Sequence, residues 1–174
     1  EESARVPLII CVPGKQPAVC NSFVELLDLY PTISHLCGLE VPERLQGEDL
    51  STMLDYPEQQ VREAAFSVNG KGFLLRTDRW AYIQYREDAS AGIELFDMHA
   101  DPEQYHNLSE SPEHRDIVEQ FKTRLAEKLR RVALQLLGVL ARVDVNLLEA
   151  EVLAVALLGK CFGQVVLQYA ATHG

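Results

Sequence analysis

Basic side chains are scarce in this sequence of 174 residues, which carries 16 Lys and Arg against 26 Asp and Glu and has a formal net charge of -10. Nucleic acids and anionic membrane surfaces attract proteins that present a positive field. The shortage of positive charge therefore argues against both as partners. Charged side chains also interrupt every apolar stretch before it reaches the length of a bilayer crossing, so we expect no ordinary membrane-spanning helix.

The sequence also lacks the features of a chain start. Residues 1–5 contain no methionine, no basic start and no signal-peptide core, and we expect the chain to begin within a longer protein. The composition, with 47% hydrophobic and 24% charged residues, excludes the disordered and low-complexity classes. The length predicts one ordinary domain, or one domain with an appendage.

The composition changes abruptly after residue 132. Residues 133–174 make 42 positions with two basic and three acidic side chains, a local net charge of 2 − 3 = -1, and are rich in Leu, Val and Ala. A change of this kind marks a boundary. We expect an atypical apolar, helix-prone tail, and a frameshifted or read-through sequence is the alternative.

Two apolar patterns predict elements in the first third of the chain. Residues 6–12 read V-P-L-I-I-C-V, a continuous apolar run that is typical of a strand buried on both faces, as in parallel sheets. Residues 24–39 predict a helix, with Asp28 as its N-cap and Gly38 as the residue that ends it. The residues at helical spacing on one face of this predicted helix are Leu29, Ile33, Leu36 and Cys37.

The middle of the chain changes to a period of two. Short alternating runs at residues 64–68, 73–77, 80–85 and 94–97 predict an antiparallel meander. A helix is predicted to begin at Ser111-Pro112, to end near residue 132 and to cover the meander. Its apolar stripe consists of Ile117, Val118, Phe121, Leu125, Leu129 and Val132.

Several short motifs occur in a fixed order along these elements. They are A-R-V-P-L-I-I at residues 4–10, V-E-L-L-D-L-Y-P-T at 24–32, C-G-L at 37–39, L-Q-G-E-D-L at 45–50, R-T-D-R-W-A-Y at 76–82, E-L-F-D-M at 94–98 and D-P-E-Q-Y-H-N-L at 101–108. This order closely resembles the C-terminal part of type I sulfatases, in particular the iduronate-2-sulfatase-like branch. The resemblance extends from residue 4 to about residue 132.

The resemblance implies the alkaline-phosphatase-like α/β architecture, in which a large mixed sheet with helices on both faces is followed by a small antiparallel sheet with a C-terminal helix. Residues 1–56 would be the terminal strand and helices of the large domain. Residues 57–132 would be the small subdomain, and residues 133–174 the atypical tail.

The resemblance also implies an activity whose machinery this sequence lacks. The family hydrolyses sulfate esters with a formylglycine made from a cysteine in a C-x-P-S-R context and with a calcium ion held by Asp and Asn. Cys11 and Cys20 are not followed by the Ser-Arg pair of that context, and no two aspartates are adjacent. We therefore expect no catalytic residue, metal or cofactor in this chain, and expect calcium, formylglycine and a sulfated sugar substrate only in the full-length enzyme.

One residue is a candidate for substrate binding. Lys71 lies in the predicted loop N-G-K-G between two strands, and in the resembling branch the corresponding insertion reaches toward the substrate. Lys71 could contact an anionic sugar, and an ordinary solvated loop lysine is the alternative.

Several other residues resemble functional groups, but their patterns predict structural roles. The spacing of His99, Asp101 and His106 fits no short-loop zinc pattern and predicts an acidic surface turn. Trp80, Tyr82 and Tyr85 alternate along a predicted strand as core or sheet-face residues do. The four cysteines form no metal or redox motif, which predicts free thiols.

Two other functions remain open. The chain could be a non-catalytic interaction or dimerisation module that self-associates through the strand at residues 6–12 and the apolar tail. It could also belong to a related phosphodiesterase or phosphonate hydrolase, since these enzymes share the architecture. The resemblance to sulfatases implies an exported, periplasmic or lysosomal protein.

Overall fold

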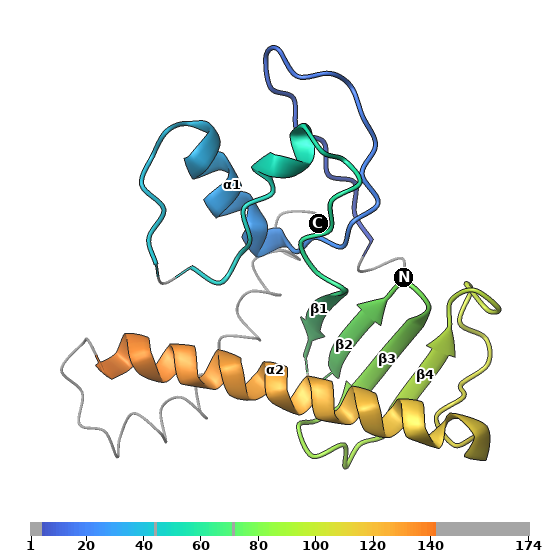
Figure 1. Cartoon of the computed structure of the whole chain (residues 1–174). Coiled ribbons are helices and arrows are strands. Elements are labelled where there is room, and N and C mark those ends of the chain that lie inside the picture. The colour runs from blue at the N-terminus through green and yellow to red at the C-terminus, as the bar shows by residue number, and fades with distance from the viewer. Residues whose placement is uncertain (1–4, 44, 71, 142–174) are drawn as a thin grey trace, which may run out of the picture. The chain divides into compact units, whose positions relative to one another are not determined.

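The computed structural model describes residues 5–43, 45–70 and 72–141 (Figure 1). These residues form two compact units, the first made of residues 5–66 with Arg76–Arg79 and the second of Ser67–Leu75 with residues 80–141. The boundary expected between residues 56 and 57 stays a prediction. The expected tail at residues 133–174 lies largely outside the described residues.

Short helices and loops make up most of the first unit. A 3-10 helix, η1, at Leu26–Asp28 leads directly into the α-helix α1 at Leu29–Leu36, and a second 3-10 helix, η2, follows at Ser51–Leu54. The predicted helix is therefore confirmed but shorter. Gly38 ends it as predicted: its φ is 67°, a left-handed value that glycine adopts without strain, and Leu39 N–H donates to Ser34 O at 2.8 Å.

The strand predicted at residues 6–12 is wrong for this structure. The segment has no strand conformation, and the side chains of Val6, Leu8 and Ile9 are 55%, 41% and 88% exposed. A strand needs a neighbouring strand to bond its backbone groups. No strand among the described residues pairs with this segment, so its apolar pattern alone did not produce one.

The apolar face predicted for α1 is only partly confirmed, because Leu29 and Leu36 are half-buried whereas Ile33 is 55% exposed and Cys37 is exposed. The buried side chains of α1 are Pro31, Thr32 and Ser34. Polar as well as apolar groups therefore fix how this helix lies.

Four strands form one sheet in the order β1-β2-β3-β4, so each strand lies beside its neighbours in sequence (Figure 1). The strands are β1 at Ala64–Asn69, β2 at Gly72–Thr77, β3 at Trp80–Tyr85 and β4 at Ile93–Asp97. β3 and β4 are antiparallel, with Tyr82 opposite Leu95. The predicted meander is confirmed to within one residue at each end.

The segment that follows β4 folds back along the outer edge of this strand. Leu108 N–H donates to Leu95 O at 2.8 Å, and Leu95 N–H donates to the Asn107 side-chain oxygen at 3.0 Å. Ser109 Oγ donates to Ile93 O at 2.9 Å. The D-P-E-Q-Y-H-N-L motif therefore bonds the outward backbone groups of β4.

The long helix α2 at Arg115–Ala141 covers the sheet (Figure 1), after a 3-10 helix, η3, at Pro112–His114. Of the predicted stripe, Ile117 and Leu129 are half-buried and the others are buried, namely Val118, Phe121, Leu125 and Val132. The Phe121 ring stacks on the Tyr82 ring at 5.4 Å between centroids. The predicted end near residue 132 is wrong, because the helix-forming Ala, Leu and Gln that follow extend α2 to Ala141.

The core beneath α2 contains one polar chain of hydrogen bonds. Tyr82, which is fully buried as predicted for a core residue, donates its hydroxyl to Gln84 Oε1 at 2.7 Å. Gln84 Nε2 donates to Arg86 O at 3.0 Å and to Glu87 O at 2.8 Å. Burial and the charge of Glu119 raise the pKa of Tyr82, so its hydroxyl stays a donor and fixes the start of the β3–β4 connection.

None of the helices described between residues 5 and 141 combines the length and apolar character that crossing a membrane requires.

Candidate functional site

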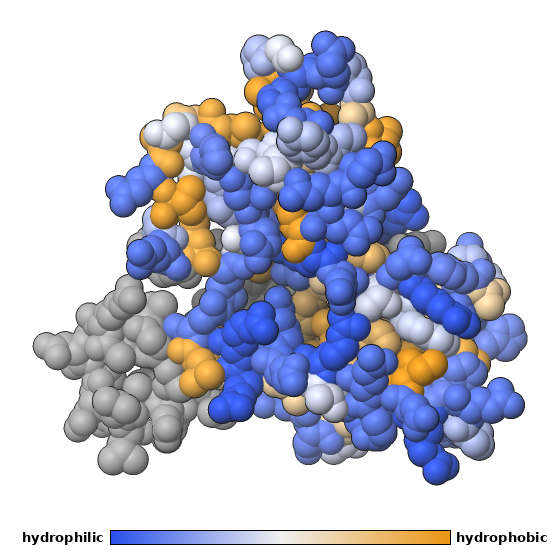
Figure 2. Space-filling model, in the orientation of Figure 1, coloured by the Kyte–Doolittle hydropathy of each residue, from blue (hydrophilic) through white to orange (hydrophobic). Residues whose placement is uncertain are grey.

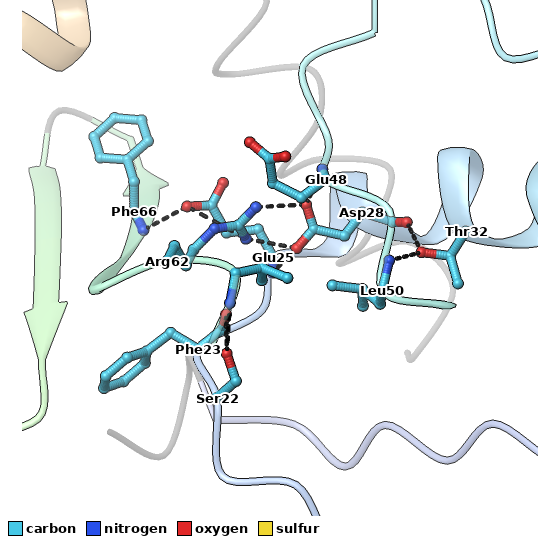
Figure 3. Close-up of polar contacts among 10 residues, drawn as sticks. Ser22, Phe23, Glu25, Asp28, Thr32, Glu48, Leu50, Arg62 and Phe66 are labelled. Carbon is cyan, nitrogen blue, oxygen red and sulfur yellow. Dashed lines mark hydrogen bonds and ion pairs between the residues drawn. The ribbon is translucent and has the colours of Figure 1, made fainter. Parts of the chain in front are cut away.

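Two of the sequence motifs converge on the carboxylate of Asp28, which is fully buried (Figure 3). Glu25 N–H donates to its Oδ2 at 2.6 Å, from within the motif at residues 24–32. Glu48 N–H donates to its Oδ1 at 2.8 Å, from within the motif at residues 45–50. Asp28 therefore ties the loop at residues 45–50 to the start of α1.

Arg62 supplies the counter-charge for this carboxylate. Its guanidinium binds Asp28 with two parallel hydrogen bonds, Nη1 to Oδ2 at 2.5 Å and Nη2 to Oδ1 at 2.6 Å. The Arg62 side chain is 13% exposed. Bidentate geometry of this kind is the strongest form of an ion pair in proteins, and burial makes it costly to break.

Two further carboxylates make the environment of Arg62 strongly negative. Glu25 Oε1 lies 3.8 Å from Arg62 Nη1 and accepts a hydrogen bond from Phe66 N–H at 2.9 Å. Burial lowers the pKa of Arg62, but the hydrogen bond to Asp28 and the charges of Glu25, Asp28 and Glu48 outweigh burial and raise it. Three carboxylates thus surround one permanently charged guanidinium.

Thr32 makes a second hydrogen-bonded link between the motif at residues 24–32 and the motif at residues 45–50. Its hydroxyl donates to Asp28 O at 2.6 Å, one turn back along the helix, and accepts from Leu50 N–H at 2.9 Å. Thr32 is fully buried. The aspartate and threonine of the D-L-Y-P-T run therefore have a common structural task, which is to hold the loop that contains Gly47, Glu48 and Leu50.

Gly47 is the point of closest approach between this loop and η1. A Cβ atom at residue 47 would overlap Leu27 O and would lie 2.6 Å from Leu27 C and 2.9 Å from Asp28 Cα. These neighbours are backbone atoms, which cannot move aside as a flexible side chain does. Only glycine fits there.

We expect Gly47→Ala to destabilise the first unit by about 1–3 kcal/mol, as overpacking of a filled site does. The loop must shift, and the hydrogen bond from Glu48 to Asp28 must lengthen. Faster hydrogen exchange in peptides covering residues 26–50 would report the loss. Gly72→Ala is the control for substitution of a glycine, because Gly72 has no left-handed φ and a Cβ there would lie no closer than 3.4 Å to its neighbours; equal losses of stability for both changes would contradict the prediction.

The carboxylate of Asp28 has no acceptor site left for catalysis or for a metal. The two oxygens of Asp28 accept four hydrogen bonds, which is the full capacity of a carboxylate. Among residues 5–141 as described, no group of three His, Cys, Asp or Glu side chains could hold a metal ion. The residues present do not fit the calcium ion that the resemblance implies, and the excess negative charge around Arg62 does not suit a sulfate group.

The structure therefore corrects the role predicted for Asp28. Asp28 is the N-cap residue of α1 by position, as predicted, but its side chain makes no cap hydrogen bond to α1. The carboxylate instead completes a capping box with Glu25 at the start of η1 and binds Arg62 and Glu48 N–H. Arg62 was missed by the sequence analysis. Arg62 lies 34 residues from Asp28 in the sequence. Helical or strand periodicity does not predict an ion pair between residues so far apart.

A second contact between α1 and the same loop joins His35, whose side chain is 62% exposed, to Asp49, whose side chain is 31% exposed. His35 Nδ1 lies 2.5 Å from Asp49 Oδ2, and Asp49 also accepts from the backbone and hydroxyl of Ser51, both at 2.9 Å. Burial raises the pKa of Asp49, but the hydrogen bonds from Ser51 and the charge of His35 outweigh burial and lower it.

A lowered carboxyl pKa means that Asp49 stabilises the folded state above its unfolded pKa of about 3.9 and loses this effect as pH falls through the folded value. We therefore expect the melting temperature of the native sequence to exceed that of Asp49→Asn at pH 7, and the difference to shrink below about pH 4. A difference that is constant from pH 7 to pH 3 would show that the charge of Asp49 plays no part.

The other predicted site residues lie elsewhere or serve turns. Lys71 lies outside the described residues, so its proposed contact with a sugar stays a prediction. Asp97 Oδ1 accepts from His99 N–H at 3.1 Å, and Asp101 Oδ2 accepts from His106 N–H at 2.7 Å, which confirms a hydrogen-bonded turn there. Cys11, Cys20 and Cys37 are free and exposed, and Cys161 lies outside the described residues.

Comparison with known proteins gives sulfatases among the curated relatives. The solved structures of similar fold include sulfatases and a phosphonate monoester hydrolase of Silicibacter pomeroyi, which is 21% identical with a TM-score of 0.61 over 70% of this chain and 28% of that one. The sequence is 33% identical to arylsulfatase K of Bos taurus over 123 residues, which is 63% of this chain and 23% of the relative. It is 30% identical to an ulvan-active sulfatase of Formosa agariphila over 142 residues, 74% of this chain and 27% of the relative. Among solved structures, a 2-O GAG sulfatase is similar at 29% identity and a TM-score of 0.50, over 60% of this chain and 24% of that one.

The chain thus spans about a quarter of the length of the relatives it matches. The fold expected from the resemblance, with a small antiparallel sheet and a C-terminal helix, agrees with that of the sulfatases. The family of C-terminal regions of N-sulphoglucosamine sulphohydrolase matches residues 1–131. The chain therefore belongs to this family of sulfatase C-terminal regions.

Proposed function

We propose that this chain is the C-terminal part of an enzyme that hydrolyses sulfate esters, with sulfated carbohydrate as its substrate. The match of the sulfatase C-terminal family to residues 1–131 carries this proposal. Both curated relatives described above are named as sulfatases, and one of the similar solved structures is that of a 2-O GAG sulfatase.

In this proposal the chemistry belongs to the larger part of the enzyme. The formylglycine nucleophile and the calcium ion would be supplied there, because this sequence contains no C-x-P-S-R motif and its described residues contain no group of three His, Cys, Asp or Glu that could hold a metal ion. The present chain would supply structure, through the Asp28–Arg62 network and the sheet covered by α2. Lys71 remains the one residue of this chain that we propose as a sugar contact.

The motif order supports a finer proposal, that the enzyme belongs near the iduronate-2-sulfatase-like branch. The likeness to a 2-O GAG sulfatase points in the same direction. A preference for 2-O-sulfated over 6-O-sulfated disaccharides is then expected. The reverse preference would place the enzyme in another branch without changing its class.

The test is a chimera in which residues 1–131 of this chain replace the matched region of bovine arylsulfatase K. We expect the chimera to release sulfate from an aryl sulfate, and this chain alone to release none above a heat-killed control. Replacing the formylglycine cysteine of the chimera is the matched negative control. A folded, soluble chimera that hydrolyses a phosphonate monoester but no sulfate ester would overturn the proposal, and so would one that hydrolyses neither, as expected for a non-catalytic interaction module.

A further inference from the structure

The segment that bonds the outer edge of β4 contains a motif for covalent modification. Asn107-Leu108-Ser109 reads N-x-S with a residue other than proline in the middle, which is the acceptor sequence for N-linked glycosylation. No other asparagine of the sequence is followed two positions later by Ser or Thr. Asn107 is exposed and belongs to the second unit, whose surface is part of the view in Figure 2. Its side chain is therefore the candidate acceptor for an N-linked glycan in this sequence.

In the folded chain, the polar groups of this motif bind the backbone of β4. Asn107 Nδ2 donates to Ile93 O at 3.3 Å, and Asn107 Oδ1 accepts from Leu95 N–H at 3.0 Å. Ser109 N–H donates to the same Oδ1 at 3.0 Å, and Ser109 Oγ donates to Ile93 O at 2.9 Å. The amide and the hydroxyl that define the motif are thus both engaged in closing this edge of the sheet.

The side of the Asn107 amide that faces β4 is the side that a glycan would occupy. Ile93 O and Leu95 N–H are successive outward groups of one strand. A planar amide that bonds both must turn toward them its Oδ1 and the N–H on the same side as Oδ1. A glycosylated asparagine is a secondary amide, which is trans as in the backbone and places the sugar on the side of its oxygen. The sugar would therefore replace the N–H that binds Ile93 O.

We propose that Asn107 is a conditional N-glycosylation site, which accepts a glycan only while residues 107–109 are detached from β4. In the transfer, Nδ2 attacks C1 of an oligosaccharide that is linked to a lipid diphosphate. The bond from Nδ2 to C1 forms, the bond from C1 to the diphosphate oxygen breaks, and the amide loses one proton as the lipid diphosphate leaves. The attached glycan then prevents the amide from binding Ile93 again, so the glycan and the closed edge exclude each other.

The experiment presents the purified full chain to a eukaryotic oligosaccharyltransferase with a lipid-linked oligosaccharide, and mass spectrometry measures the rate of transfer. Phe121→Ala opens the second unit, because Phe121 is 2% exposed and stacks on Tyr82. Transfer should follow the population of the open form, so we expect it to be at least about tenfold faster for Phe121→Ala than for the native sequence. Leu134→Ala is the matched control, because Leu134 is 57% exposed on the same helix and its truncation should leave the slow rate unchanged.

Two further controls identify the acceptor. Asn107→Gln should abolish transfer in every background, and an unfolded peptide of residues 101–113 should accept the glycan at least as fast as Phe121→Ala does. Equal rates for the native sequence and Phe121→Ala would overturn the proposal, because the closed edge would then accept a glycan. A peptide that accepts no glycan would also overturn it, and so would a Phe121→Ala chain that accepts none beside a peptide that does.

Hydrogen exchange measures the reverse effect, that of the glycan on the edge. Molecules of the native sequence that have accepted a glycan, separated on a lectin column, should exchange the amide hydrogens of Leu95 and Leu108 at least about tenfold faster than molecules without one. Equal exchange in both would show that the glycan and the closed edge coexist, and would overturn the proposal. Neither measurement depends on sulfate ester hydrolysis, so the outcome is independent of the proposed function.

Discussion

Arg62→Ala is expected to destabilise the first unit by about 3–5 kcal/mol, the loss typical of removing one partner from a buried ion pair. Asp28 would keep its hydrogen bonds from Glu25 and Glu48 but would remain fully buried without its guanidinium. Urea denaturation followed by hydrogen exchange in peptides covering residues 25–36 measures the effect on this unit separately.

Lys15→Ala provides the matched control. Lys15 also pairs with an aspartate, at 2.5 Å from Asp55 Oδ1, but the two side chains are 34% and 52% exposed. An exposed pair contributes about 0.2–1 kcal/mol. Arg62→Lys should fall between the two, because lysine restores the charge but not the two parallel hydrogen bonds. Similar losses for Arg62→Ala and Lys15→Ala would show that burial of the network contributes nothing.

Phe121→Ala is expected to destabilise the second unit by about 3–5 kcal/mol, as other large truncations of buried aromatic residues do. Phe121 is 2% exposed and stacks on Tyr82 with an angle of 19° between the rings. The substitution leaves a cavity between α2 and β3 and removes a ring contact as well as buried area. The fluorescence of Trp80, the one tryptophan of the sequence, reports unfolding from within β3.

Leu134→Ala is the control on the same helix. Leu134 is 57% exposed, so its truncation should change the free energy of unfolding by less than about 0.5 kcal/mol. If both substitutions lowered the midpoint equally, the stability of the unit would come from the length of α2 and not from its packing on the sheet.

The sequence predicted the second unit better than the first for a physical reason. Strand alternation and the stripe on α2 are local patterns, and both partners, the sheet and the helix, lie in this part of the chain. Residues 6–12 carry an equally clear apolar pattern. The described residues contain no strand to pair with them, so the same kind of pattern gave an exposed, extended segment.

The sequence analysis identified Asp28 of the candidate site but not its partner Arg62. The motifs directed attention to Asp28, and the N-cap preference of aspartate gave it a plausible local role. One of its partners is local, the N–H of Glu25, but the others come from residues 48 and 62, and a contact across 34 residues leaves no periodic signal. The only indication in the sequence was that Asp28 lies within the largely apolar motif at residues 24–32. A charged residue in such a motif needs a partner of opposite charge if it is buried.

The hydrogen bonds along the outer edge of β4 decide how this sheet can meet other chains. An unbonded edge strand is a template on which a second molecule can add its own strand, and repeated addition builds fibrils. Asn107, Leu108 and Ser109 already occupy backbone groups of Ile93 and Leu95, so an incoming strand would have to displace them. The segment that follows the small sheet thus blocks the addition of a foreign strand at the β4 edge.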